Sequence, residues 1–303
     1  MTLESDFLLD RRRLKRRLAA WRIVAIVALV AALLAGVARY DGWLGRDHVA
    51  RFTVEGLILD DPEIFEALSE VAEDSRAKAL IVRIDSPGGT FVGGEMLFIA
   101  LRMVAESKPV VAVMGTVATS AGYMAAVASD RIFARQGTIT GSIGVIMQTM
   151  DFSGLLEKIG VTAEAIKSDP LKATPSPLEP LSDEARAASQ ALIDEMHELF
   201  TAMVAERRGF DPERARALAD GRVYSGRQAL ANGLIDAIGG EAEARGWLME
   251  EKGIADTLPV RDIEVGEPSD EWLPDVRGLY KNMLFSERLT LDGLVSLWHP
   301  EQR

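Results

Sequence analysis

The sequence predicts an α/β fold built around a parallel β-sheet. Strand-like and helix-like segments alternate between residues 49 and 134, which is typical of βαβ units. Two of the strand-like segments, residues 79–84 and 110–114, are mostly apolar runs, as expected for strands covered on both faces. With 303 residues, 48% of them hydrophobic and 26% charged, the chain has an ordinary globular composition and room for one large domain or two small ones.

The first half of the chain supplies the elements of this sheet. Asp61-Pro62 suits the N-cap and first turn of a helix. The expected elements, in order, are a strand at 49–59, a helix at 61–72, a strand at 79–84, a helix at 93–106, a strand at 110–114, a helix of small residues at 120–128 and a short strand at 131–134.

The second half is helical after a break. Residues 168–184 hold four prolines and interrupt regular structure. Residues 183–208 then carry apolar side chains at helical spacing, which predicts one long amphipathic helix, and residues 211–219 predict a short one. After residue 250 the pattern weakens. We expect residues 251–303 to form a partly ordered C-terminal extension with one amphipathic helix near 286–298. This helix packs as local core, on a neighbouring subunit or on the membrane surface.

The N-terminus combines a basic arm with an apolar segment. Residues 1–22 hold seven Lys or Arg and three acids, a net charge of +4, which leaves −16 for the rest of the chain. Residues 23–37 carry no charge. We therefore expect a cytoplasmic arm at 1–17, a transmembrane anchor at 18–38, close to the ~20 residues that cross a bilayer, and a tether at 39–48 outside the cytoplasm. The alternatives are a cleaved signal peptide or a buried core helix.

A first candidate site follows the buried strand at 79–84. Asp85-Ser86-Pro87-Gly88-Gly89 places a glycine pair at the carboxyl end of a predicted parallel strand. Glycine backbone lets bare N–H groups face a ligand, as an oxyanion hole requires. The alternative is a plain strand-to-helix turn.

A second candidate site follows the strand at 110–114. The stretch Gly115-Thr116-Val117-Ala118-Thr119-Ser120-Ala121-Gly122-Tyr123 places Ser120 where the next helix is expected to begin. The unpaired N–H groups there favour a developing oxyanion. The alternative is that Ser120 is simply the N-cap of that helix.

A serine nucleophile needs a base, and histidine is a poor candidate here. The histidines are His48, His197 and His299, and His197 falls in the middle of the long amphipathic helix. A Ser-His-Asp triad is therefore poorly supported. The chain has no cysteine, which excludes a cysteine-based zinc site.

Lysine is the other candidate for the base. Between residues 120 and 251 the chain has only Lys158, Lys167 and Lys172. Lys158 ends a helix-like segment and is expected in solvent. Lys167 lies just before the proline-rich break and Lys172 within it, so either can turn inward.

Four motifs in order resemble those of a known family. They are Asp85-Ser86-Pro87-Gly88-Gly89, Thr119-Ser120-Ala121-Gly122-Tyr123, Thr140-Gly141-Ser142-Ile143-Gly144-Val145 and Asp220-Gly221-Arg222-Val223-Tyr224-Ser225-Gly226. Together they resemble the signal peptide peptidase A family, in its short bacterial, membrane-anchored form with a Ser–Lys dyad. The resemblance covers residues 48–250 and the anchor.

The resemblance assigns a role to several residues. It implies that Ser120 is the nucleophile, that Lys172, shortly before Ser176-Pro177, is the general base, that Ser142 orients the lysine, and that the N–H of Gly89 belongs to the oxyanion hole. One departure is Ala121, where the family often has glycine. An added methyl keeps the backbone N–H, so we expect activity with a narrower cleft.

The same resemblance implies a fold and an activity. The fold is that of Clp proteases and crotonases, with repeated ββα and βαβ units in a peptidase domain at 49–250, and no cofactor or metal is expected. The activity is that of a serine endopeptidase at the periplasmic side of the bacterial inner membrane, which cleaves remnant signal peptides and other hydrophobic peptides. A homo-oligomer is also implied, and the acidic body argues against nucleic-acid binding.

The dyad chemistry constrains the lysine. Its amine must be neutral to accept a proton, whereas a free lysine has a pKa of ~10.4, so burial in an apolar site has to lower it. Two other functions stay open. One is a catalytically inactive, membrane-bound scaffold, which predicts an exposed Lys172. The other is a crotonase-like acyl-CoA enzyme, which an extracytoplasmic location disfavours because no CoA is supplied there.

Overall fold

The computed structural model describes residues 21–31, residues 46–265 and the backbone of residues 295–297. The chain divides into two compact units between Asp47 and His48. In the first unit, residues 21–31 form a helix with exposed side chains. No helix among the described residues is both long and apolar enough to cross a membrane. The predicted basic arm, the rest of the predicted anchor, most of the tether and most of the C-terminal extension lie outside the described residues.

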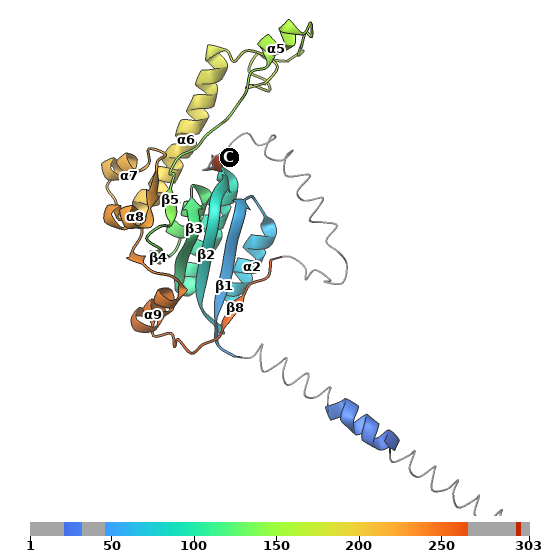
Figure 1. Cartoon of the computed structure of the whole chain (residues 1–303), viewed down its shortest axis with the longest axis vertical. Coiled ribbons are helices and arrows are strands. Elements are labelled where there is room, and N and C mark those ends of the chain that lie inside the picture. The colour runs from blue at the N-terminus through green and yellow to red at the C-terminus, as the bar shows by residue number, and fades with distance from the viewer. Residues whose placement is uncertain (1–20, 32–45, 266–294, 298–303) are drawn as a thin grey trace, which may run out of the picture. The chain divides into compact units, whose positions relative to one another are not determined.

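The described strands of the second unit form one sheet (Figure 1). Its order is β6-β5-β3-β2-β1-β8; β4 also pairs with β3, β7 pairs with β4, and β9 pairs with the end of β2. Pairing is parallel except between β5 and β6 and between β2 and β9. The strands are β1 (His48–Ile58), β2 (Ala77–Thr90), β3 (Val110–Thr119), β4 (Arg131–Ala134), β5 (Ile139–Gly141), β6 (Val223–Ser225), β7 (Ala237–Ile238), β8 (Val260–Asp262) and β9 (Val295–Leu297).

Helices connect the parallel strands, which confirms the predicted α/β class. The long helix expected at 183–208 is present as α6, and it begins after a Ser182 side chain that caps the N–H of Ala185. The helices of the second unit are α2 (Pro62–Glu73), α3 (Phe91–Ser107), α4 (Ala121–Val127), α5 (Ser153–Lys158), α6 (Asp183–Arg208), α7 (Pro212–Leu218), α8 (Gly226–Asn232) and α9 (Glu241–Lys252).

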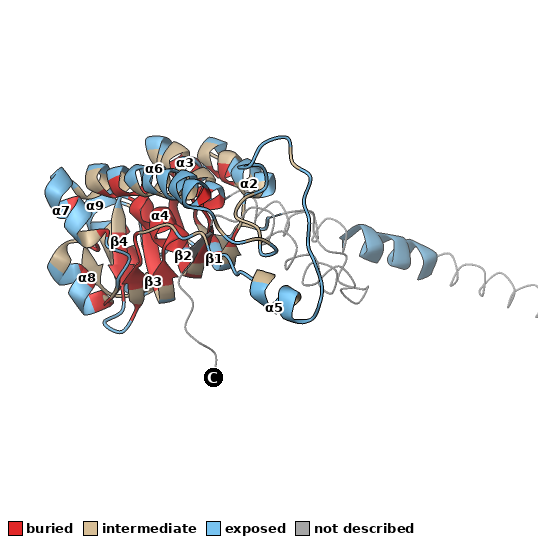
Figure 2. Cartoon of the chain, turned by 90° about the horizontal axis from the view of Figure 1, so that it is seen from above, coloured by how far each residue is buried: buried red, intermediate tan, exposed pale blue. Residues whose placement is uncertain are grey.

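Both faces of the central strands are covered, as their apolar runs predict. On one face, α2, α3, α4 and the second half of α6 bury the larger cluster of apolar side chains. On the other face, α9 covers a smaller cluster through Ala244 and Leu248. Figure 2 shows the buried sheet beneath the helices. Burying a side chain the size of leucine or isoleucine stabilises the fold by about 1.5–3 kcal/mol, so these two clusters fix the strands that carry the candidate site.

β2 runs further than the sequence predicts. It continues beyond residue 84 to Thr90, so the glycine pair is part of a strand and the alternative of a strand-to-helix turn is wrong. Gly88 and Gly89 pair with Leu57 and Ile58 of β1 after an irregularity in the register. A Cβ on Gly89 would lie 1.7 Å from the carbonyl oxygen of Ile58, so the two strands approach there only because no side chain intervenes.

The end of the C-terminal extension also differs from the prediction. Residues 295–297, expected at the end of an amphipathic helix, form β9 and pair antiparallel with residues 88–90. The main chain of β2 has an open edge there, and an extended segment can add to it through backbone hydrogen bonds.

Among the described helices, α4 is the one that is buried throughout, and Ser120 directly precedes it. All seven of its residues are buried. It lies close to α3 because α3 has Gly94 at the contact, where an added Cβ would lie 2.8 Å from the Cβ of Ala121. The hydroxyl of Tyr123 donates to the carbonyl oxygen of Leu234 at 2.8 Å, and burial raises the pKa of this phenol, which keeps the donor protonated.

Between β5 and α6 the chain leaves the body in an excursion, residues 145–182. It contains α5, and it extends beyond the far end of α6 (Figure 1). The excursion exposes several large apolar side chains, namely Ile146, Met150, Phe152, Leu155, Ile159, Val161, Ile166, Leu171 and Leu178. Contiguous exposed apolar surface of this kind is typical of an interaction site.

Candidate active site

Ser120 occupies the sharp turn between β3 and α4. Its backbone has φ 57° and ψ −122°, a conformation that costs a non-glycine residue about 1–3 kcal/mol and that is concentrated at functional sites. The residue is 1% exposed. Its side chain makes no capping hydrogen bond to α4, so the alternative of a simple N-cap is not supported. The turn is held by the N–H of Ser120, which donates to the carbonyl oxygen of Gly141 at 2.9 Å.

The parallel register brings Ser142 next to Ser120. Thr119 of β3 pairs with Gly141 of β5, so the two serines directly follow partner positions on neighbouring strands, which lie about 4.8 Å apart. Ser142 is also buried and also has a positive φ, of 50°. Its N–H donates to the carbonyl oxygen of Arg222 at 2.9 Å. The predicted pair of nucleophile and orienting serine therefore lies at one edge of the sheet.

The predicted oxyanion segment lies on the other side of Ser120. β2 pairs with β3 on the side away from β5. The hydroxyl of Thr119 donates to the carbonyl oxygen of Pro87 at 2.9 Å. This bond ties the residue before Ser120 to the segment that contains Gly89. Ser120, Ser142 and Gly89 are thus brought to the same end of three adjacent strands.

Two supporting side chains were missed by the sequence analysis. The carboxylate of Asp85 accepts a hydrogen bond from the N–H of Val117 at 3.0 Å, within the irregular stretch where β3 changes its register on β2. The second side chain is that of Thr119, which donates the hydrogen bond to Pro87 described above. Both residues are part of the motifs quoted above, but only the register of β2 on β3 reveals that they fasten these two strands together at the site.

The described histidines are engaged elsewhere. Nε2 of His197 lies 2.7 Å from the carbonyl oxygen of Ala219 and donates to it, because a carbonyl can only accept. His48 begins β1 at its amino end, beside Asp74. His48 therefore lies at the opposite end of the parallel strands from Ser120, and His197 is bonded to Ala219, which agrees with the expectation that a Ser-His-Asp triad is poorly supported.

Lys172, the predicted base, is not brought to this edge within one copy of the chain. It lies in the loop between α5 and α6, whereas Ser120 lies between β3 and α4. The excursion that contains this loop extends away from the body, beyond the far end of α6 (Figure 1). The side chain of Lys172 is exposed, and no hydrogen bond or ion pair joins its ammonium to another described residue. The site is therefore incomplete in the single chain, and an exposed Lys172 is what the scaffold hypothesis predicts.

Lys167, the other candidate base, is already engaged. Its ammonium forms an ion pair with the carboxylate of Glu179, and its side chain is only 15% exposed. The amine of Lys167 is therefore directed at a carboxylate of its own loop. The contact therefore favours Lys172 over Lys167 as the base.

Comparison with known proteins identifies the family. The model of peptidase family S49 matches residues 102–255, half of the chain. A protein of Synechocystis sp. (strain ATCC 27184 / PCC 6803 / Kazusa), whose name assigns it provisionally to the proteases, is 37% identical over 80% of this chain and 92% of its own length. The chain belongs to peptidase family S49. The resemblance drawn from the four motifs is thereby confirmed at the level of the family.

Other members of the family are longer than this chain. The chloroplastic serine protease SPPA of Arabidopsis thaliana is 34% identical, over 83% of this chain and 39% of its own length. Protease 4 of Haemophilus influenzae is 32% identical, over 76% of this chain and 38% of its own length. Among solved structures, a mutant of the 1510-N membrane-bound stomatin-specific protease has a TM-score of 0.47 at 17% identity, over 73% of this chain and 99% of that chain, which is too low to establish a shared fold.

Proposed function

We propose that this S49 member is a serine endopeptidase that uses Ser120 as nucleophile and Lys172 as general base. The observation that carries the proposal is the strained, buried Ser120 on the turn between β3 and α4. Sparsely populated backbone geometry at a buried residue is concentrated at functional sites, where the strain is part of the mechanism. The neighbours of Ser120, Ser142 and Gly89, supply the polar groups that acyl transfer requires.

The proposed reaction follows from these groups. The Oγ of Ser120 attacks the peptide carbonyl carbon while the neutral amine of Lys172 takes the hydroxyl proton, and the N–H of Gly89 donates to the oxyanion. As the C–N bond breaks, Lys172 returns the proton to the leaving amine. Water then hydrolyses the ester on Ser120, with Lys172 as the base a second time.

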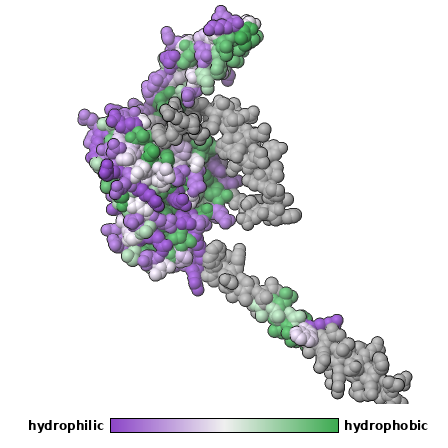
Figure 3. Space-filling view, in the orientation of Figure 1, coloured by the Kyte–Doolittle hydropathy of each residue, from purple (hydrophilic) through white to green (hydrophobic). Residues whose placement is uncertain are grey.

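A second copy of the chain is the proposed source of the base. Lys172 is exposed on the excursion, and Ser120 is buried in the body, so the two residues of one copy do not come together. Apolar side chains gather around α5 at the tip of the excursion (Figure 3). If they pack on a neighbouring copy, burial stabilises the assembly, and Lys172 enters the desolvated surroundings in which a lysine is more readily neutral. A homo-oligomer thus explains both the exposed surface and the missing base.

The proposed substrates are remnant signal peptides and other hydrophobic peptides at the periplasmic side of the inner membrane. The basic residues 1–17, followed by the uncharged residues 23–37, support a membrane anchor with its N-terminus in the cytoplasm. An anchor would hold the cleft near peptides that stay in the bilayer. The Clp protease and crotonase-like architecture is proposed with it. Protease added to intact spheroplasts tests the topology, because it degrades the domain only if the domain lies outside the cytoplasm.

The alternative is an inactive scaffold of the same fold, favoured by the exposed Lys172. The decisive experiment uses the full chain purified in detergent, a fluorogenic hydrophobic signal-sequence peptide and a fluorophosphonate that acylates reactive serines. The peptidase proposal expects cleavage and labelling in the wild-type chain and neither in Ser120→Ala. A wild-type chain that is folded and assembled but neither cleaves nor becomes labelled would establish the scaffold.

A further inference from the structure

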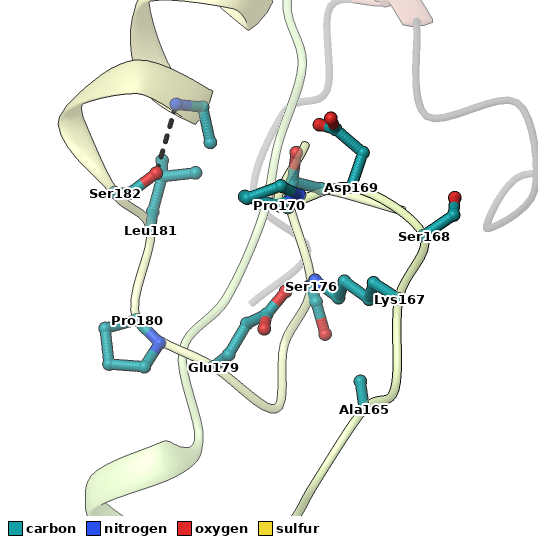
Figure 4. A pocket seen from close by; sticks show the side chains of 12 residues that line it. Ala165, Lys167, Ser168, Asp169, Pro170, Ser176, Glu179, Pro180, Leu181 and Ser182 are labelled. Carbon is teal, nitrogen blue, oxygen red and sulfur yellow. Dashed lines mark hydrogen bonds and ion pairs between the residues drawn. The ribbon is translucent and has the colours of Figure 1, made fainter. Parts of the chain in front are cut away.

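The loop that carries Lys172 is closed at its base by one ion pair. Lys167 stands at the start of the loop and Glu179 at its end, and the two side chains point toward each other across it (Figure 4). The Lys167 side chain is 15% exposed and that of Glu179 is 36% exposed. The pair therefore joins two chain segments that twelve residue positions separate.

Within the loop, the backbone around Lys172 is internally fixed. The N–H of Lys172 donates to the carbonyl oxygen of Asp169 at 3.0 Å. The N–H of Leu171 donates to the carboxylate of Asp169 at 3.1 Å, and the hydroxyl of Thr174 donates to the carbonyl oxygen of Leu171 at 2.9 Å. Lys172 therefore moves with this turn as a unit.

The turn has little packed interior to hold it in place. A cavity of about 430 Å³ lies between the loop and the start of α6, and both Lys167 and Glu179 line it, together with Asp169 and Ser176. The described side chain of Lys172 is exposed. Because the loop borders a cavity, its shape depends on the ion pair that closes it rather than on a packed apolar core.

We infer that the Lys167–Glu179 ion pair is a clasp that positions Lys172 for catalysis, so that Lys167 and Glu179 are positioning residues. This inference rests on the proposed function. A partly exposed ion pair contributes little to global stability, so opening it should leave the fold and the assembly intact. A catalytic group displaced by about 1 Å, however, loses about 100-fold in rate. The kinetic effect of the clasp therefore exceeds its effect on stability.

Arginine substitutions distinguish a positioning role of Lys167 from a role as the general base. An arginine at position 167 can keep the ion pair with Glu179, but its guanidinium does not give up a proton in a protein. Lys167→Arg should therefore retain most of the activity, whereas Lys172→Arg should abolish it. If Lys167 were the base, Lys167→Arg would be inactive and Lys172→Arg would retain activity.

The experiment uses the full chain in detergent, with Lys167→Met, Lys167→Arg and Glu179→Gln beside matched controls. Lys158→Met and Glu164→Gln remove the same side-chain types from exposed positions of the excursion. The measured quantities are the rate constant of Ser120 acylation by a fluorophosphonate, the fraction of Ser120 labelled at completion, and kcat on the hydrophobic peptide. The fraction of Ser120 labelled at completion reports how many sites are folded. If the ion pair had a purely structural role, its loss would lower this fraction.

The clasp predicts acylation and kcat about 10- to 100-fold lower in Lys167→Met and Glu179→Gln, with complete labelling at the end and with both controls at the wild-type rate. It is overturned if Lys167→Met matches Lys158→Met, if Lys167→Arg is as inactive as Lys172→Arg, or if the labelled fraction falls with the rate. A wild-type chain that is itself unreactive would instead overturn the proposed function and the clasp with it.

Discussion

The close approach of α3 and α4 provides a quantitative test of how the fold positions Ser120. Gly94 of α3 faces α4, and an alanine there would place its Cβ 2.8 Å from the Cβ of Ala121 and 2.7 Å from the sulfur of Met124. Met124 ends in a flexible thioether that can turn aside. Ala121 cannot, because it directly follows Ser120 in the chain, so α4 itself has to move.

The size of the effect follows from these distances. Carbon atoms pack at about 3.5–4.0 Å, so relief of a 2.8 Å contact needs a displacement of about 1 Å, which lowers a catalytic rate by about 100-fold. Overpacking costs about 1–3 kcal/mol of unfolding free energy, offset in part by about 0.5–1 kcal/mol that alanine gains over glycine in a helix. Gly94→Ala should therefore lower stability by about 1 kcal/mol and kcat/KM far more.

The assay combines denaturant unfolding with kcat/KM on the fluorogenic hydrophobic peptide. Gly246→Ala in α9 is the matched control, because no atom lies within 4 Å of the added Cβ. It should be more stable than wild type by about 0.5–1 kcal/mol, with unchanged activity. Adding Ala121→Gly to Gly94→Ala should restore part of the rate. Wild-type kcat/KM in Gly94→Ala would refute the idea that this contact sets the position of Ser120.

Three further substitutions test the surroundings of the nucleophile. Ser142→Ala should leave unfolding unchanged and lower kcat by about 10- to 100-fold, because the lysine loses a group that orients it; unchanged kcat would remove Ser142 from the site. Thr119→Val leaves the carbonyl of Pro87 without its donor and should cost about 1–3 kcal/mol in chemical denaturation, with a drop in kcat that a purely structural bond would not cause. Tyr123→Phe should cost a similar amount with kcat retained, and a loss of labelling at Ser120 would contradict that expectation.

Local hydrophobic patterns predicted the elements of the body, because each pattern matches the burial of that element in the fold. The apolar runs at 79–84 and 110–114 became central strands covered on both faces, and the periodic residues 183–208 became α6. Ser142 was assigned to the site by the resemblance alone. The structure supplies the physical reason, because Ser120 and Ser142 each follow a strand and the parallel strands β3 and β5 end at a common edge.

The remainder depends on contacts that are distant in sequence. The glycines extend β2 because they pair closely with Leu57 and Ile58 of β1. That partner strand is distant in the sequence, so no local pattern predicts the extension. The choice between Lys167 and Lys172 rested on the resemblance alone. The ion pair with Glu179 gives it a physical reason, since one lysine is engaged and the other is exposed.

The central claim is that Ser120 of one copy and Lys172 of another form one catalytic site. The most direct test mixes two inactive full-length variants, Ser120→Ala and Lys172→Ala, under conditions that let subunits exchange, and measures peptide cleavage. With random mixing in a cyclic assembly, about a quarter of the sites pair an intact serine with an intact lysine from the neighbour, so the mixture should regain about that share of wild-type activity. A mixture that co-assembles but stays inactive, or either variant active alone, would contradict the claim.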